Sequence, residues 1–219
     1  MAKIKVHGLP FSSCTARVLA CLNEKQVEYE LIPVNARAGD HKKPQYLSLN
    51  PFGLFPALED GCLTLFESRA IIKYLAKKYE GQGCPNLLGS TVEEEAVVEQ
   101  WCEVESHHFN PPCYALVSQI IINPLKGGTT DEAVVESNAE KLSRVLDVYE
   151  DRLSKSKYLA GDWFSLADLQ HMPFLHYLVN DVGKATLISS RKHVNAWWED
   201  ISSRPAWKKI AVHMKFPSK

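Results

Sequence analysis

The chain opens with apolar residues at every second position and then changes to a helical spacing. In the segment KIKVHG, Ile4 and Val6 are separated by polar residues, which is the two-residue period of a half-buried strand. Gly8 and Pro10 end this pattern. Beyond them, apolar residues recur at helical spacing between positions 18 and 22. We therefore expect a strand followed closely by a helix.

Hydroxyl side chains precede this expected helix. Ser12, Ser13 and Thr15 are each candidates for its N-cap. The start of a helix presents unpaired backbone N–H groups and a partial positive charge. A hydroxyl at that point could therefore also donate a hydrogen bond to an anion such as a thiolate. Taken alone, the stretch favours simple capping, because serine is a common cap.

Further strands and a second helix complete the first 80 residues. Residues 29–34 read as a strand, and a β-α-β unit of this length predicts a parallel pair with a right-handed crossover. After Pro56, a short strand leads through the hairpin signal Asp60-Gly61 into residues 63–66. A helical pattern follows, with Glu67 and Ser68 in its first turn. These elements predict one small α/β domain with a mixed four-stranded sheet.

A polar segment at residues 35–45 lies within this domain. It is too polar to bury much surface, so we expect a surface loop or a short helix. The cations His41, Lys42 and Lys43 are clustered in it. Such a cluster either binds a carboxylate or is simply solvated, and the segment alone favours solvation.

The second half of the chain predicts helices only. Residues 1–80 form the α/β domain, residues 81–91 a linker rich in Gly and Pro, and residues 92–219 an all-α domain. The expected helices span 92–109, 113–122, a long segment capped by Thr129 or Thr130, a segment from Leu166 through Leu178, 194–203, and a last one from Pro205. In the long helix, the expected apolar stripe begins at Val134. Ser165 and Asp168 have the spacing of a capping box at the start of the helix at Leu166.

Composition and charge exclude several classes of function. The formal net charge of −1 argues against nucleic acid or an anionic membrane as a partner. The sequence has no long apolar run and nothing resembling a signal peptide, so we expect a cytoplasmic protein. The six cysteines contain no C-x-x-C pair, and we expect reduced thiols and no metal site.

Four longer motifs now become informative. The segments NPFGLFPALEDG, LFESRAIIKYLAKKY, GGTTDEAVVESNAEKL and KYLAGDWFSLADLQH, on this domain plan, resemble the soluble glutathione transferases, and most of all the phi class of plants. The resemblance covers almost the whole chain. It implies a thioredoxin-like N-terminal domain, an all-α C-terminal domain and glutathione as co-substrate, with no other cofactor.

The resemblance also implies roles for individual residues. Ser12 matches the catalytic serine that stabilises the glutathione thiolate, although the adjacent Ser13 could share the role. The other matches to glutathione-binding positions are His41 and Lys42 for the glycine carboxylate, Leu54 and Phe55 before the family's cis-proline at Pro56, and Glu67 and Ser68 for the γ-glutamyl end. Leu54-Phe55 departs from the usual Gln-Val, which predicts a lost side-chain amide contact.

The second substrate implied by the family is an apolar electrophile, and a hydroperoxide is a further expected substrate. Its candidate walls are Phe11, Ile122 and Tyr177, although core packing explains the last two equally well. The resemblance implies a homodimer, with Phe52 as a possible anchor. Two alternatives stay open: a thiol transferase that uses Cys14, and a non-catalytic carrier of apolar small molecules.

Overall fold

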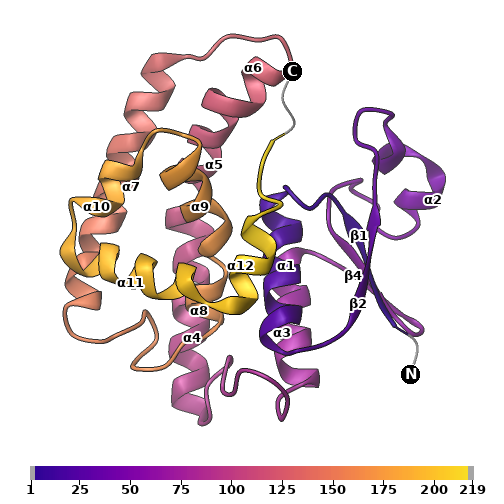
Figure 1. The fold of residues 1–219 in the computed structure, drawn as a ribbon, viewed down its shortest axis with the longest axis horizontal. Coiled ribbons are helices and arrows are strands. Elements are labelled where there is room, and N and C mark those ends of the chain that lie inside the picture. The colour runs from indigo at the N-terminus through magenta and orange to yellow at the C-terminus, as the bar shows by residue number, and fades with distance from the viewer. Residues whose placement is uncertain (1–2, 217–219) are drawn as a thin grey trace. The chain divides into compact units, whose positions relative to one another are not determined.

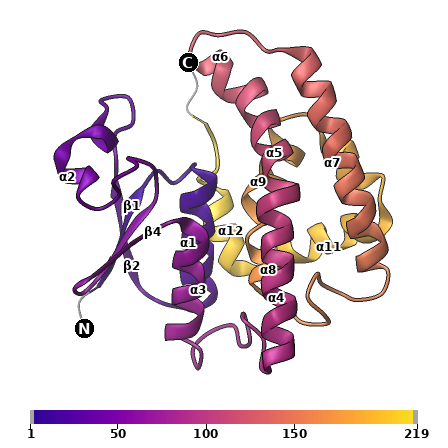
Figure 2. The same cartoon turned by 180° about the vertical axis from the view of Figure 1, so that it is seen from behind.

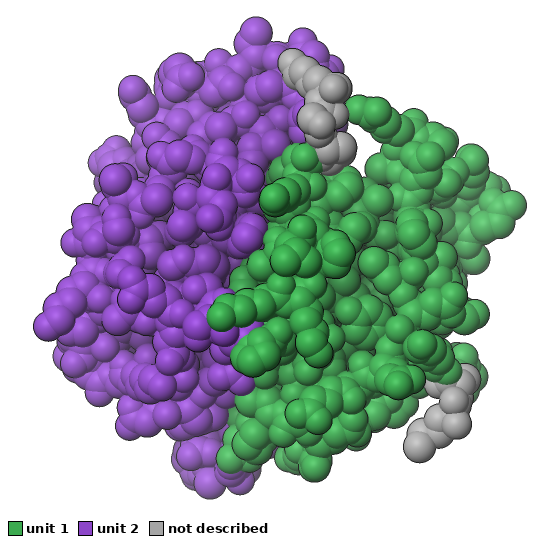
Figure 3. Space-filling model, in the orientation of Figure 1, with its two compact units in different colours: residues 1–87, 205–216 green, residues 88–204, 217–219 purple. Residues whose placement is uncertain are grey.

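The computed structural model describes residues 3–216, which divide into two compact units (Figure 3). Unit 1 holds the described residues up to Leu87 together with Pro205–Phe216. Unit 2 holds the described residues from Leu88 to Arg204. In the described part of the chain, no helix has the length and apolar character that a membrane crossing requires.

Unit 1 is built on a four-stranded sheet of order β2-β1-β3-β4 (Figure 1). β1 and β2 are parallel, whereas β3 is antiparallel to both β1 and β4, so the predicted mixed sheet is confirmed. The strands are β1 (Ile4–Gly8), β2 (Tyr29–Pro33), β3 (Ala57–Asp60) and β4 (Leu63–Phe66). The helices are α1 (Ser13–Glu24), η1 (Asp40–Lys42), α2 (Pro44–Leu47), α3 (Ser68–Lys78) and α12 (Pro205–Ala211).

The two faces of this sheet are covered differently. Helices α1 and α3 pack together on one face, and α2 lies on the other, as both ribbon views show (Figures 1 and 2). Alternate residues Ile4 and Val6 of β1 are buried, as the two-residue period predicted. On the side of α2, a small cluster of Val34, Tyr46 and Ala57 is buried, with Leu49 and Phe55 packed against it.

One boundary differs from the sequence prediction. Helix α12 packs against α1 and belongs to unit 1, whereas the sequence assigned everything from residue 92 to the end to the helical domain. Trp207 and Ile210 explain the difference, because they lie three residues apart on one helical face and are 2% and 3% exposed. The pattern predicted the helix itself, but sequence spacing does not say which core a helix joins.

The first helical column of unit 2 does not end at Pro111-Pro112, where the sequence suggested a break. It also continues through Pro124. It consists of α4 (Val92–Val104), the π-helical segment η2 (Glu105–Phe109), α5 (Asn110–Val117), a second π-helical segment η3 (Ser118–Ile122) and α6 (Asn123–Leu125) (Figure 2). Each π segment immediately precedes an Asn-Pro pair. A proline lacks the N–H of the usual helical bond, and the wider turn accommodates this without ending the helix.

The remaining helices of unit 2 are α7 (Glu132–Leu153), α8 (Leu166–Leu169), α9 (Met172–Asn180), α10 (Ala185–Ser189) and α11 (Lys192–Ser203). The long helix α7 is capped by Asp131, whose carboxylate accepts from the N–H groups of Ala133 and Val134, so the predicted threonine cap is wrong. Asp and Thr are both favoured N-cap residues, so the sequence alone does not show which of them caps the helix. The buried stripe begins at Val135 and not at Val134.

The capping box at Ser165 is confirmed, and α8 starts at Leu166 as predicted. Asp168 is fully buried and accepts hydrogen bonds from the backbone of Leu159 and from the indole of Trp197, at 3.0 and 2.9 Å. The expected single helix through Leu178 is interrupted between α8 and α9. Pro173 lies in the first turn of α9 and cannot donate to the preceding turn, which explains the interruption.

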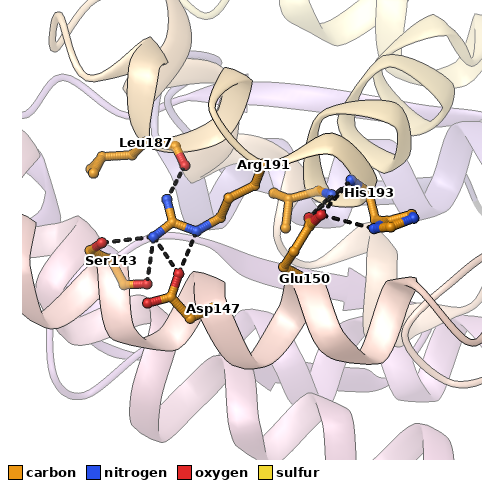
Figure 4. Close-up of polar contacts among 7 residues, drawn as sticks. Ser143, Asp147, Glu150, Leu187, Arg191 and His193 are labelled. Atoms are coloured by element: carbon orange, nitrogen blue, oxygen red, sulfur yellow. Dashed lines mark hydrogen bonds and ion pairs between the residues drawn. The ribbon is translucent and has the colours of Figure 1, made fainter.

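Two side chains join α11 to α7 (Figure 4). Glu150 of α7 accepts from the backbone N–H groups of His193 and Val194 and from Nδ1 of His193, so it caps α11 from another helix. Arg191, just before α11, donates to the carboxylate of Asp147 and to Ser143. Figure 4 shows the two groups side by side along one face of α7.

Candidate functional site

The strand register of unit 1 brings three separate segments to one edge of the sheet. His7, next to the end of β1, pairs with Ala57 at the start of β3, and Ala57 pairs with Phe66 at the end of β4. The same edge of the sheet therefore carries the start of α1, which follows β1, and the start of α3, which follows β4. It also carries the Phe55-Pro56 dipeptide, which precedes β3. This edge carries five of the seven residues matched to glutathione binding, namely Ser12, Leu54, Phe55, Glu67 and Ser68.

Ser12 is the N-cap of α1, as the sequence predicted. Its Oγ accepts from the N–H of Thr15 at 3.5 Å, near the outer limit of a hydrogen bond. The side chain is half-buried, and Ser13 follows as the first residue of α1. The N–H of Thr15 occupies one acceptor position of the Ser12 hydroxyl oxygen. The hydroxyl proton of Ser12 is therefore available to donate to an anion at the positive end of α1.

Gly8 lets the end of β1 approach α1 closely. A Cβ at Gly8 would lie 2.5 Å from Oγ1 of Thr15, far inside van der Waals contact. Thr15 is fully buried in the first turn of α1. The position of the Ser12 hydroxyl relative to the sheet edge therefore depends on a residue without a side chain at position 8.

A buried arginine connects the starts of α1 and α3. Arg17 is 0% exposed, and its Nη1 donates to Oγ of Ser68 at 2.8 Å and to Sγ of Cys14 at 3.7 Å. Ser68 is itself 5% exposed at the first position of α3. Cys14, the thiol of the alternative thiol transferase, thus lies in the first turn of α1 against the guanidinium of Arg17.

Glu67 is held in an unusual backbone conformation. It precedes α3 with φ at +68°, although it has a side chain, and it is exposed. Such a conformation costs on the order of 1–3 kcal/mol and is typical of functional sites. Sequence analysis placed Glu67 inside the first helical turn, whereas the structure makes it the residue before the helix, with its side chain in solvent.

The third part of the site is the pair His41 and Lys42 in η1. Nζ of Lys42 donates to the carbonyl oxygens of Phe52 and Gly53, both at 3.0 Å, which fixes the ammonium over the loop before Pro56. The Nδ1 atom of His41 is buried and has no hydrogen-bond partner among the described residues. Gly53, with φ at +58°, is required here, because a Cβ would lie 2.6 Å from the carbonyl oxygen of His41.

Leu54 and Phe55 approach this pair from the other side. The carbonyl oxygen of Leu54 accepts from the hydroxyl of Tyr46 at 2.7 Å and from Nδ2 of Asn50 at 2.8 Å, and the Leu54 side chain is 56% exposed. The Phe55 ring lies 5.4 Å from the ring of His41, centre to centre. The Phe55-Pro56 bond is cis, as the resemblance implied.

The backbone of Phe55 is available to a ligand. Among the described residues, neither its N–H nor its carbonyl oxygen has a hydrogen-bond partner. Phe55 is half-buried, and backbone groups in such positions are normally paired. An extended peptide-like ligand lying along Phe55 would satisfy both groups, as in the addition of a short strand.

The three candidate walls for an apolar substrate are placed separately. Phe11, beside Ser12 in unit 1, is half-buried, with its ring centre 5.6 Å from that of Phe216. Ile122 is half-buried at the end of η3 in unit 2. Tyr177 of α9 is 1% exposed, and burial raises the pKa of its hydroxyl. Tyr177 is therefore a core residue of unit 2, the packing role that the sequence left open.

Sequence reasoning missed the residues that hold the site residues in place. Arg17, Tyr46 and Asn50 each donate to a site residue, yet none belongs to the matched motifs as a ligand contact. The signal for Arg17 was its position one turn into α1 on the buried face, where an arginine needs a polar partner.

Comparisons with known proteins agree with this geometry. The family model for the N-terminal domain of glutathione S-transferases matches residues 2–77, and the model for their C-terminal domain matches residues 109–205. Together they cover most of the chain. The chain belongs to the glutathione S-transferase family. The relatives include plant phi-class enzymes, as the motifs indicated.

Individual relatives cover nearly the full length of this transferase. Glutathione S-transferase F9 of Arabidopsis thaliana is 52% identical over 98% of this chain and 99% of its own. The crystal structure of glutathione transferase F7 from Populus trichocarpa has a TM-score of 0.94 at 51% identity, covering 97% of this chain and all of its own. A maize glutathione S-transferase I in complex with an atrazine–glutathione conjugate has a TM-score of 0.90 at 43% identity, covering 97% of this chain and 98% of its own.

These relatives establish the reaction class. This transferase uses glutathione as co-substrate and transfers groups to its sulfur, with no further cofactor. The described residues contain no group of three or more His, Cys, Asp or Glu side chains that could hold a metal ion.

Proposed function

We propose that glutathione lies along the edge of the unit 1 sheet, with its thiolate at Ser12. The γ-glutamyl end meets Glu67 and Ser68, the cysteinyl backbone pairs with Phe55, and the glycine carboxylate meets His41 and Lys42. The free backbone of Phe55 carries this proposal, because no other described segment satisfies it. The register that places Ala57 between His7 and Phe66 brings the segments that carry Ser12, Phe55 and Glu67 to one edge of the sheet, which supports one extended ligand along that edge.

The charges at the two ends suit a tripeptide with ionised termini. Glu67 is exposed and acidic, which suits the ammonium of the γ-glutamyl residue, and the N–H groups at the start of α3 suit its carboxylate. At the other end, Lys42 uses two of its three N–H donors on Phe52 and Gly53. The third donor is left for the glycine carboxylate.

Ser12 activates the thiol by hydrogen bonding to its ionised form. A free thiol has a pKa of about 8.5 and is only a few per cent ionised at pH 7. The Ser12 hydroxyl and the start of α1 both stabilise a thiolate, and each unit by which they lower the thiol pKa is worth about 1.4 kcal/mol. Nucleophilic attack then forms a carbon–sulfur bond while a leaving group such as chloride departs with the electron pair, and the thiol proton goes to solvent.

The second substrate is an apolar electrophile. Phe11, adjacent to Ser12, supplies apolar surface for it, whereas Tyr177 is left out of the proposed site because it is buried. Leu54 adds further exposed apolar surface beside Phe55. Conjugation of an aryl chloride, measured beside hydroperoxide and disulfide reduction, tests this proposal. Conjugation should dominate, and activity on the disulfide alone would contradict it.

We further propose a homodimer in which Phe52 is an anchor. Phe52 is 65% exposed, which is unusual for a phenylalanine, and the centre of its ring lies 5.9 Å from that of Phe66. Unit 2 carries an apolar groove of about 500 Å³ between α4 and α7, with Trp101, Val145 and the 58% exposed Val148 among its lining residues. An exposed aromatic ring and an apolar groove of this size are complementary between two copies.

We also propose that the reaction takes place in the cytosol. All six cysteines are free thiols in the structure, as expected where glutathione keeps thiols reduced.

A further inference from the structure

His41 and Lys42, which the proposed function assigns to the glycine carboxylate, are tied to the loop before Pro56. Nζ of Lys42 donates to the carbonyl oxygens of Phe52 and Gly53, both at 3.0 Å. The backbone at Gly53 passes so close to η1 that a Cβ there would lie 2.6 Å from the carbonyl oxygen of His41 and 2.9 Å from Nζ of Lys42. The ammonium of Lys42 therefore has a fixed position relative to this loop.

The aromatic ring of Phe55 packs against His41. The centres of the two rings are 5.4 Å apart, with 56° between their planes. The Phe55 ring also lies 6.2 Å from the ring of Tyr46, in an edge-on arrangement. Ring pairs at such separations attract one another in addition to burying apolar area. Because Nδ1 of His41 is buried, the imidazole can meet a ligand only through Nε2, and the Phe55 ring limits where Nε2 can lie.

The backbone N–H of Phe55 is fixed through the preceding carbonyl group. The carbonyl oxygen of Leu54 accepts from the hydroxyl of Tyr46 at 2.7 Å and from Nδ2 of Asn50 at 2.8 Å. These two donors are 6% and 2% exposed, and closely packed side chains have little room to move. Since a peptide group is planar, holding the carbonyl of Leu54 also holds the N–H of Phe55. The proposed function assigns that N–H to the cysteinyl residue of glutathione.

The third residue of the tripeptide must therefore span two fixed points. The Phe55 backbone holds its cysteinyl end, and the cations of His41 and Lys42 hold its carboxylate. One additional methylene in the third residue moves the carboxylate by up to the length of a C–C bond, about 1.5 Å. Hydrogen bonds to charged groups are strong only within a narrow range of donor–acceptor distances, so a rigid pair of cations loses a carboxylate displaced by this amount.

We propose that the Phe55 side chain determines specificity for the co-substrate. It restricts the site to tripeptides in which one carbon separates the last amide nitrogen from the carboxylate, as in glutathione. This inference rests on the proposed function of the same site. The family's usual valine at this position has no ring to pack against His41, so the phenylalanine at position 55 makes the carboxylate subsite more rigid.

Two isomeric peptides separate spacing from bulk. γ-Glutamyl-cysteinyl-β-alanine places the carboxylate one carbon further away, whereas γ-glutamyl-cysteinyl-alanine keeps the spacing and carries the extra carbon as a methyl branch. In conjugation of an aryl chloride, the β-alanine peptide should have a KM about tenfold above that of glutathione. Its kcat should stay within about twofold, because the carboxylate lies away from the thiol. The alanine peptide should have a KM within about threefold of that of glutathione. Calorimetric titration of all three peptides gives their affinities independently of turnover.

Phe55→Val tests whether the ring causes the discrimination. This variant keeps the backbone groups of position 55, and the ratio of the β-alanine peptide KM to the glutathione KM should fall from about ten to about two. Leu54→Ala is the matched control, because it removes a comparable number of apolar atoms from the neighbouring side chain, which is 56% exposed. In that control the ratio should remain at about ten.

Equal affinities for glutathione and the β-alanine peptide in the unmodified protein would overturn the inference. An equal loss of affinity with both isomers would also overturn it, because bulk and not spacing would then be selected. An unchanged ratio in Phe55→Val, or the same fall in Leu54→Ala, would overturn the role of the Phe55 ring. All of these outcomes leave the proposed function intact, since glutathione still binds. If glutathione itself failed to bind, the proposed function would fail, and this inference with it.

Discussion

Nη1 of Arg17 lies 2.8 Å from Oγ of Ser68, so one buried guanidinium joins the first turn of α1 to the first turn of α3. These two turns carry Ser12 and the Glu67–Ser68 pair, which the proposal assigns to the thiolate and to the γ-glutamyl end. Their spacing is therefore set by a side chain that is 0% exposed. In the proposed glutathione site, Arg17 is therefore a positioning residue for these two turns.

Replacing Arg17 by methionine should raise the KM for glutathione about tenfold and lower kcat much less. The hydroxyl of Ser68 loses the donor that orients it, which is worth on the order of 1–2 kcal/mol. Stability should change little, because an apolar side chain of similar length avoids burying a charge. Steady-state kinetics with varied glutathione measures the effect.

Arg17→Lys is the matched control, since it keeps the charge but not the planar guanidinium. It should give an intermediate KM. A wild-type KM in Arg17→Met would show that the link to Ser68 does not position the site.

Leu54→Gln should tighten glutathione binding about fivefold. The Leu54 side chain is 56% exposed, and its carbonyl oxygen is already satisfied by Tyr46 and Asn50, so the change leaves the loop intact. Glutamine restores a side-chain amide, and one added hydrogen bond is worth about 1 kcal/mol. Calorimetric titration of glutathione measures the gain. Leu54→Met, apolar and of similar size, should bind like the unmodified protein, and equal affinity in the two variants would refute the account.

Phe52→Ser should dissociate the proposed dimer. Truncation of a central aromatic anchor costs about 2–4 kcal/mol, which corresponds to a roughly 30- to 1,000-fold weaker association. Sedimentation velocity at several concentrations measures it. Val92→Ser serves as the control, because Val92 is 78% exposed but lies outside both the Phe52 loop and the groove. If the two variants dissociate alike, or neither does, Phe52 is not the anchor.

Glu150 makes the stability of unit 2 depend on pH (Figure 4). Burial acts to raise the pKa of Glu150, but the N–H groups of Val194 and His193 and the His193 ring outweigh it, so the folded-state pKa lies below the usual value. For a carboxyl group with a lowered folded pKa, the stabilisation is present above the unfolded pKa of about 4.3 and is lost as the pH falls through the folded pKa.

Glu150→Gln should therefore lower the free energy of unfolding by about 1 kcal/mol at pH 7, as expected for loss of a partly exposed helix cap. The difference from the unmodified protein should shrink below about pH 4. Urea unfolding at the two pH values measures both quantities. Glu140→Gln, which alters an exposed ion pair with Arg144, is the control and should have little effect. A constant difference across this pH range would contradict the role of Glu150.

The sequence predicted the sheet and most helices because local signals and packing agree there. The alternation around Ile4 and Val6, the Asp60-Gly61 hairpin and the Ser165–Asp168 capping box each specify one structure, and each is found. The sequence prediction was wrong where a change in helix geometry accommodates a proline that would otherwise end the helix. Pro111-Pro112 predicted a break between two helices, but the π-helical segment η2 just before Asn110 keeps the helix continuous.

The candidate site could be located from the sequence, but not how its residues are held. The motifs identified Ser12, Phe55 and Glu67, whereas the positive φ of Glu67 and the buried link from Arg17 depend on tertiary contacts that no local pattern encodes. Tyr177 shows the reverse case. Its helical spacing fitted a substrate wall and a core position equally, and only its burial separates the two.

The ionisation of bound glutathione in Ser12→Ala tests the central claim most directly. The thiolate absorbs in the ultraviolet, so its pKa can be titrated in the complex, with Ser13→Ala as the control beside it. We predict that the pKa of the bound thiol in Ser12→Ala rises by at least about one unit, equivalent to about 1.4 kcal/mol, while glutathione still binds and Ser13→Ala is unchanged. An unchanged thiol pKa in Ser12→Ala would contradict the account.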